Sequence, residues 1–134
     1  MTVRPIRLRL SRARGFNLQH ASRAANGLPA MSVARPSTWG NGFKIRPGDE
    51  IPEYGIVLPA IETAGQAVQL HRAWLAGFLA TAFGADFLAP LRGHNLACWC
   101  GLCAAHAATG RPAGADCADC APCHADTLLE FANP

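Results

Sequence analysis

The chain of 134 residues lacks long hydrophobic runs, although half of its residues are hydrophobic. No stretch of about 18 apolar residues is present, so we expect no transmembrane helix and no membrane partner. The first residues, Met1 to Pro5, carry charge without an apolar segment behind them, so we also expect no signal peptide and a cytoplasmic protein. Cysteines in such a protein are thiols or metal ligands more often than disulfides. The length predicts one domain over residues 1–134.

Acidic residues are missing from the first third of the chain. Residues 1–46 hold eight arginines and one lysine, with no Asp or Glu, whereas residues 47–134 hold three arginines and all nine acids. A basic segment of this kind favours an anionic partner, which we expect to be a nucleic acid, a nucleotide or a phosphorylated metabolite. The alternative is an arginine-rich surface that only faces solvent.

Regular structure is sparse in the first half of the chain. Residues Ile6–Leu10 alternate apolar and basic side chains, which predicts a half-buried strand, and Ala30–Arg35 is a second short strand candidate. Residues 11–29 and 37–59 are rich in Gly, Asn and Pro, and we expect loops there. A loop as long as the second is more often functional than not.

The clearest predicted helix begins after Thr63, which is a suitable N-cap. Gln66 completes a capping box, and Gly84 lies where a left-handed C-cap is expected. Apolar residues follow at helical spacing and predict one buried face: Ala67, Leu70, Trp74, Leu75, Phe78, Leu79 and Ala82.

The remaining segments complete an alternation of strands and helices. We expect a short helix over Asp86–Arg92, a buried strand over Asn95–Trp99 and a final helix over His124–Ala132. Residues 101–122 form a Cys/Ala/Gly-rich insertion with little capacity to build a core. This order predicts an α/β (or α+β) fold, in which helices pack on a short central sheet.

All six cysteines fall within 26 residues: Cys98, Cys100, Cys103, Cys117, Cys120 and Cys123. His106 and His124 lie in the same stretch or beside it. Clustered thiolates are typical ligands of zinc and of iron–sulfur clusters. Four thiolates, or three with a histidine, would close a structural zinc site, whereas three cysteines with one open iron would make a reactive cluster. Disulfides and plain burial are the alternatives to a metal. We expect zinc, with an iron–sulfur cluster as the alternative.

Two cysteine segments differ in their spacing. Cys117, Cys120 and Cys123 have the two-residue gaps of zinc knuckles and ferredoxin loops. The other segment is Cys98-x-Cys100-x2-Cys103, in which Cys98 and Cys100 alternate at the end of a predicted strand, so that both sulfurs lie on one face. Cys123 begins the last helix, where unpaired N–H groups favour a thiolate.

Two segments together resemble a known family, domain of unknown function 4326. Val33-Ala-Arg-Pro-Ser-Thr-Trp-Gly-Asn-Gly-Phe43 is similar to its Arg-Pro…Trp-Gly-Asn-Pro-Phe signature. Asn95-Leu-Ala-Cys-Trp-Cys100 and Pro122-Cys-His-Ala-Asp-Thr-Leu-Leu-Glu130 are similar to its closing Cys-Trp-Cys…Cys-His-Ala-Asp motif. His71-Arg-Ala-Trp-Leu75 resembles its Tyr/His-x-x-Trp-Leu segment.

The resemblance implies a small α/β domain common in phages and bacteria. It singles out the positions Arg35, Trp39, Gly40, Asn41, Phe43, Cys98, Trp99, Cys100, Cys123, His124 and Asp126. Gly42 replaces the usual proline of the first motif. Cys103, Cys117 and Cys120 are additional to the family pattern, which implies a local addition beside a shared centre formed by the other three cysteines.

The loop Trp39–Phe43 has the features of a ligand-contacting turn. Its glycines permit close approach, Asn41 offers a donor and an acceptor, and the aromatic rings could stack on a base. Arg35 could pair with a phosphate. The alternatives are an ordinary turn held by Trp39 and Phe43, and an Arg35 that pairs with a downstream acid.

Two functions compete on these features. The first is an enzyme acting on a nucleotide, nucleoside or nucleic-acid base, with Arg35, Trp39, Asn41 and Phe43 binding the substrate. In this interpretation His124 or Asp126 transfers a proton beside the metal, and His124 is also a candidate metal ligand. The second is a non-catalytic module with structural zinc, which binds nucleic acid or another protein.

Overall fold

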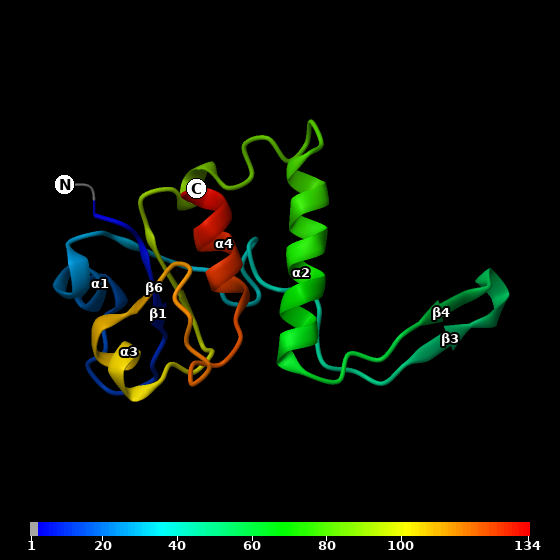
Figure 1. The fold of residues 1–134 in the computed structure, drawn as a ribbon, viewed down its shortest axis with the longest axis horizontal. Coiled ribbons are helices and arrows are strands. Elements are labelled where there is room, and N and C mark those ends of the chain that lie inside the picture. Colours follow the sequence, from blue (N-terminus) through cyan, green and yellow to red (C-terminus); the bar gives the residue numbers. More distant parts are fainter. Residues whose placement is uncertain (1–2) are drawn as a thin grey trace.

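A mixed four-stranded sheet, with the order β2-β5-β1-β6, forms the centre of the fold (Figure 1). The computed structural model describes residues 3–134. β1 (Ile6–Arg9) and β2 (Ala30–Ser32) both pair in parallel with β5 (Asn95–Cys98), and β6 (Arg111–Pro112) pairs antiparallel to β1. This arrangement confirms the predicted α/β class.

Helices cover this sheet and build the core against it. α1 (Leu18–Asn26) contacts β2, while α4 (His124–Ala132) packs on β1 and β5 and separates them from α2 (Ala64–Leu79) (Figure 1). The core lies along α4 and consists of Val33, Ala34, Leu75, Leu88, Leu91, Leu96, Cys98, Cys123, Ala125, Leu128, Leu129 and Ala132. Within residues 3–134, no helix combines the length and apolarity needed to cross a membrane.

The last predicted elements are close to the observed ones. β5 ends at Cys98, one residue before the predicted end, and all four of its residues are buried. α4 has the predicted bounds. The helix expected over Asp86–Arg92 is wrong in extent, since only Ala89–Leu91 forms a 3-10 turn. β2 is also shorter than expected and ends at Ser32.

The expected loop over residues 11–29 is wrong, because its centre forms α1. The Asn17 side chain caps the helix by accepting a hydrogen bond from the His20 N–H at 3.0 Å. Gly27, with φ of 84°, ends the helix in the left-handed conformation. Asparagine and glycine, which predicted a loop, therefore act as the two caps of a short helix.

The loop predicted over residues 37–59 contains a hairpin that projects past α2 (Figure 1). β3 (Asp49–Ile51) and β4 (Ile56–Leu58) pair antiparallel, and a 3-10 turn over Pro52–Tyr54 joins them. Each strand has only three residues, which is too short to show an alternating pattern. The prediction of a loop over these residues therefore missed the two strands.

The start of α2 confirms the predicted capping box, whereas its end differs from the prediction. Thr63 Oγ1 accepts from the Gln66 N–H at 3.1 Å, and the Gln66 side chain accepts from the Thr63 N–H at 3.2 Å. The helix ends at Leu79, well before Gly84. Gly84 is not left-handed; its role is close packing, because a Cβ there would overlap the carbonyl oxygen of Phe78.

The buried face of α2 also differs from the predicted apolar face. Ala67, His71 and Leu75 are its buried residues. Leu70 and Trp74 are 41% and 45% exposed. A histidine thus replaces an apolar side chain on the face that packs against α4.

β1 is half-buried as expected, but the basic residue Arg7 is its most buried side chain. Arg7 is 0% exposed, and its guanidinium lies 2.8 Å from the Asp126 carboxylate and 3.1 Å from the Gly101 carbonyl oxygen. A buried arginine is tolerated when an anion and a carbonyl pair with it. The alternation of Ile6–Leu10 could not reveal this, since the partner Asp126 lies 119 residues away.

Candidate metal centre

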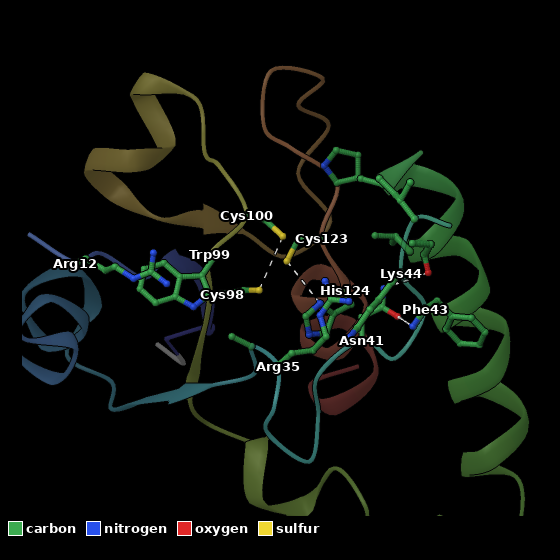
Figure 2. A pocket seen from close by; sticks show the side chains of 16 residues that line it. Arg12, Arg35, Asn41, Phe43, Lys44, Cys98, Trp99, Cys100, Cys123 and His124 are labelled. Carbon is green, nitrogen blue, oxygen red and sulfur yellow. Dashed lines mark hydrogen bonds between the residues drawn. The ribbon is translucent and has the colours of Figure 1, made fainter. Parts of the chain in front are cut away.

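Cys98, Cys123 and His124 meet where the end of β5 faces the beginning of α4 (Figure 2). All three are buried, and one ligand atom of each lies within 4.8 Å of the others. Cys100 joins them, since its sulfur lies 3.9 Å from that of Cys98. The three cysteines of the predicted shared centre are therefore neighbours in space, and Cys98, Cys123 and His124 are close enough to hold a metal ion.

A backbone carbonyl orients the His124 ring towards the cysteines. His124 Nε2 lies 2.7 Å from the carbonyl oxygen of Val33, which can only accept, so Nε2 carries the proton. In the neutral form of the ring, Nδ1 is then the nitrogen with the free lone pair, and it lies 3.8 Å from the Cys123 sulfur. This is the arrangement that fixes the tautomer of metal-binding histidines in proteins.

The cysteine thiols of this centre differ in pKa. Hydrogen bonds from Cys100 and then from Cys123 hold the pKa of the Cys98 thiol well below its usual range. The bonds with Cys100 and Cys98, together with burial, raise the pKa of Cys123. Negative charge therefore collects on one sulfur, and full ionisation of all three needs a nearby cation. A divalent metal ion provides that charge.

A cavity of about 410 Å³ opens above this centre (Figure 2). Three cationic residues, Arg12, Arg35 and Lys44, line it. Among the described residues, no Asp or Glu does so. The other lining residues are Ala34, Asn41, Phe43, Ile45, Ala64, Ala67, Val68, Cys98, Trp99, Cys100, Pro122, Cys123 and His124. The cavity thus joins a set of metal ligands to a positively charged wall.

The predicted ligand-contacting loop meets this cavity through only part of its residues. Asn41 is 7% exposed, and its amide accepts from the Phe43 N–H at 2.8 Å and donates to the Ala67 carbonyl oxygen at 3.2 Å. It therefore ties the loop to α2, while Phe43 forms part of the cavity lining. Trp39 does not line the cavity: its indole N–H donates to the Phe87 carbonyl oxygen at 3.1 Å.

The predicted substrate-binding set lacked three charged or aromatic residues of the cavity, Arg12, Lys44 and Trp99. Trp99 is 43% exposed, and the Arg12 guanidinium lies 4.7 Å from the centre of its ring. The signal for Trp99 was present, since it is the central residue of the Cys-Trp-Cys motif. No local signal marked Arg12 among the other arginines.

His71 is a further buried residue that contacts the centre. It is 2% exposed, its ring lies 5.2 Å from that of His124, and its Nδ1 has no hydrogen-bond partner. Burial, and then repulsion from His124 whenever that ring is protonated, lower the pKa of His71 to about 4, so the His71 ring is neutral at pH 7. It lines a second cavity of about 330 Å³ together with Gly40, Gly42, Phe43 and Trp74.

Asp126, which the sequence offered as a proton-transfer group, lies outside the cavity lining. Its two carboxylate oxygens pair with buried Arg7 at 2.8 Å and with Arg111 of β6 at 2.7 Å. This contact links α4 to two strands of the sheet. Its carboxylate is thus engaged by two guanidinium groups.

The remaining cysteines form a second group with His106. The ligand atoms of Cys103, His106, Cys117 and Cys120 all lie within 4.8 Å of one another. Backbone N–H groups of Cys120 and then Asp119 lower the pKa of Cys117. The six cysteines thus divide into two groups, and none of this second group lines the cavity above Cys98.

The comparisons with known proteins agree with the resemblance seen in the motifs. The family model of a domain of unknown function, DUF4326, matches residues 16–134. No curated protein and no solved structure matches the chain.

Proposed function

Since the chain belongs to the DUF4326 family, whose function is unknown, we propose that it is a zinc-dependent enzyme acting on a nucleotide. The proposed active site is the cavity above Cys98, Cys123 and His124. One observation carries this proposal: the metal-ligand group and the cations Arg12, Arg35 and Lys44 line the same cavity.

The ligand set favours a single zinc ion over an iron–sulfur cluster. In a cluster, the cysteines bind different iron atoms and are held apart by the width of the cluster. Here the sulfurs of Cys98 and Cys123 and the Nδ1 of His124 lie within 4.8 Å of one another, which suits one shared ion. Two cysteines and one histidine form a known catalytic zinc set, in which the fourth position is open to substrate.

The Cys100 sulfur lines the cavity 3.9 Å from the Cys98 sulfur, and in this proposal it does not bind the metal, so the fourth position stays open to substrate. A zinc ion held by Cys98, Cys123 and His124 would act as a Lewis acid towards a substrate oxygen. In this proposal His124 serves as a ligand, and Asp126 holds Arg7 and Arg111 in place.

The walls of the cavity support an anionic substrate that carries a base. Arg35 and Lys44 are exposed cations beside the metal ligands, where a phosphate group would find charge and hydrogen-bond donors. Trp99 and Phe43 offer aromatic surface on which a base can stack. A nucleotide combines both requirements, whereas an uncharged nucleoside meets only one.

Calorimetric titration of the zinc-loaded chain tests this proposal. We expect a nucleoside monophosphate to bind, and the nucleoside and inorganic phosphate to bind much more weakly. Arg35→Ala should weaken nucleotide binding about tenfold or more, because a charge-assisted hydrogen bond is lost. Arg23→Ala removes an exposed arginine of α1 outside the cavity and serves as the control. Equal affinities for these two variants would overturn the assignment of the cavity.

A nucleic-acid-binding module remains the second candidate, because several arginines of the first third are exposed without an acidic partner. Arg9, Arg12, Arg14 and Arg23 are exposed, and the ion pairs of the described residues involve only Arg7, Arg72 and Arg111. This candidate predicts that Arg23→Ala weakens binding of an oligonucleotide, with an affinity that falls steeply with salt. The enzyme proposal predicts that Arg23→Ala leaves nucleotide binding unchanged.

A further inference from the structure

We infer that Cys103, His106, Cys117 and Cys120 form a second zinc site, closed and structural, which is separate from the cavity. This group lies entirely within residues 101–122, the segment that the sequence marks as an insertion. It shares no residue with the cavity lining, so the inference stands independently of the proposed enzyme.

The distances within the group match a tetrahedron around one ion. With Zn–S of about 2.3 Å and Zn–N of about 2.0 Å, tetrahedral geometry places two sulfurs about 3.8 Å apart and a sulfur and a nitrogen about 3.5 Å apart. The Cys103 and Cys117 sulfurs are 3.9 Å apart. His106 Nδ1 lies 3.3 Å from the Cys103 sulfur and 3.4 Å from the Cys120 sulfur.

Backbone N–H groups point at two of these sulfurs. The Cys103 N–H lies 3.3 Å from the Cys120 sulfur, and the His106 N–H lies 3.4 Å from the Cys103 sulfur. Hydrogen bonds of this kind favour thiolate over thiol, as zinc ligation requires. The sequence spacing also suits the site, since Cys103 and His106 form one two-residue-gap pair, and Cys117 and Cys120 form the other.

Hydrophobic burial does not explain why this segment forms regular secondary structure. Of residues 101–122, all of which the structure describes, only Gly110 and Cys120 are buried. The segment nevertheless forms α3 (Ala104–Thr109) and β6, and β6 places Arg111 against Asp126. Because Cys103 and His106 lie at the start of α3, and Cys117 and Cys120 follow β6, a zinc ion shared by them would fix both ends of this segment.

Four protein ligands leave no open position, so this site has a structural role. The prediction is that the zinc holds β6 on β1 and thereby supports the chain that leads into Cys123. An iron–sulfur cluster is disfavoured, because all four ligand atoms are close enough to surround one ion.

Metal analysis of the full chain, purified without chelators, tests the inference. We expect Cys117→Ser to lose one zinc per chain relative to the wild type, whatever the occupancy of the cavity site. Asp116→Asn, which changes an exposed acid in the same loop, should keep the wild-type zinc content. Equal zinc contents in the wild type and Cys117→Ser would overturn the inference.

A ligand exchange keeps the test decisive if Cys117→Ser fails to fold. His106→Cys keeps four ligands and should keep the zinc. After replacement of zinc by cobalt, it should show stronger sulfur-to-cobalt charge-transfer absorption than the wild type, since a fourth thiolate is added. An unchanged cobalt spectrum would show that His106 is not a ligand and would overturn the site.

Discussion

Asn95 joins three parts of the chain through one amide group, although it is completely buried. Its Oδ1 accepts from the Ile6 N–H at 3.0 Å, and its Nδ2 donates to Ser22 Oγ at 2.8 Å. It also exchanges two hydrogen bonds with the Asn26 amide, at 2.9 and 2.7 Å. The start of β5 is thereby fixed to β1 and α1, and a fully satisfied buried amide specifies that one register.

We predict that Asn95→Ala destabilises the fold by about 1–3 kcal/mol, because it leaves buried polar partners without hydrogen bonds. Urea unfolding followed by circular dichroism measures the change. Gln69→Ala, on the exposed surface of α2, is the control and should change the free energy of unfolding by less than about 0.5 kcal/mol. If Asn95→Ala lowered the free energy of unfolding by less than about 0.5 kcal/mol, the hydrogen bonds of Asn95 would be dispensable for stability.

At the scale of elements, α4 carries two acids whose ion pairs have very different surroundings. Asp126 pairs with Arg7, whose side chain is 1% exposed, and with Arg111. Glu130, one turn later, pairs with Arg72, and their side chains are 53% and 40% exposed. Breaking a buried pair leaves an uncompensated charge, whereas an exposed pair exchanges its partner for water.

We predict that Asp126→Asn costs about 3–5 kcal/mol of unfolding free energy. Glu130→Gln should cost less than about 1 kcal/mol. Urea unfolding of both variants measures the difference. If Asp126 instead served only as a proton-transfer group, Asp126→Asn would keep its stability and lose activity alone, which would contradict this account.

The exposed pair also has a pH dependence of defined sign. The hydrogen bond from Arg72 lowers the pKa of Glu130. The small stabilisation from the Arg72–Glu130 pair is therefore fully present at a pH above the pKa of Glu in the unfolded chain. It is lost as the pH falls through the lowered pKa of Glu130 in the folded chain. High salt should weaken it as well, since both side chains face solvent.

At the scale of the whole molecule, the cavity gathers segments that lie far apart in the sequence. Its lining comes from Arg12, from the stretch 34–45, from the start of α2, from the end of β5 and from residues 122–124. The cations all belong to the first third and the cysteines to the last. The fold thus brings the cations of the first third and the cysteines of the last third together in the lining of one cavity.

Features set by local rules could be predicted from the sequence. The structure contains three such features, each of which depends on neighbouring residues. They are the Thr63–Gln66 capping box, the buried strand that ends at Cys98 and the helix that begins at His124. The burial of Arg7 depends on Asp126, and no local pattern contains such a partner.

The division of the cysteines into two groups was also beyond the sequence. The two-residue gaps place Cys117, Cys120 and Cys123 in one run. In the structure, Cys120 turns towards Cys103 and His106, while Cys123 enters α4 beside Cys98. The fold of residues 104–112 decides this division, and those residues carry little hydrophobic pattern.

Anomalous diffraction at the zinc absorption edge, from a crystal of the full chain, tests the central claim most directly. The account predicts a zinc peak within bonding distance of the Cys98 and Cys123 sulfurs and His124 Nδ1, at the floor of the cavity. A second peak should lie among Cys103, His106, Cys117 and Cys120. A cavity floor without a zinc peak, with or without a peak in the second group, would contradict the proposed active site.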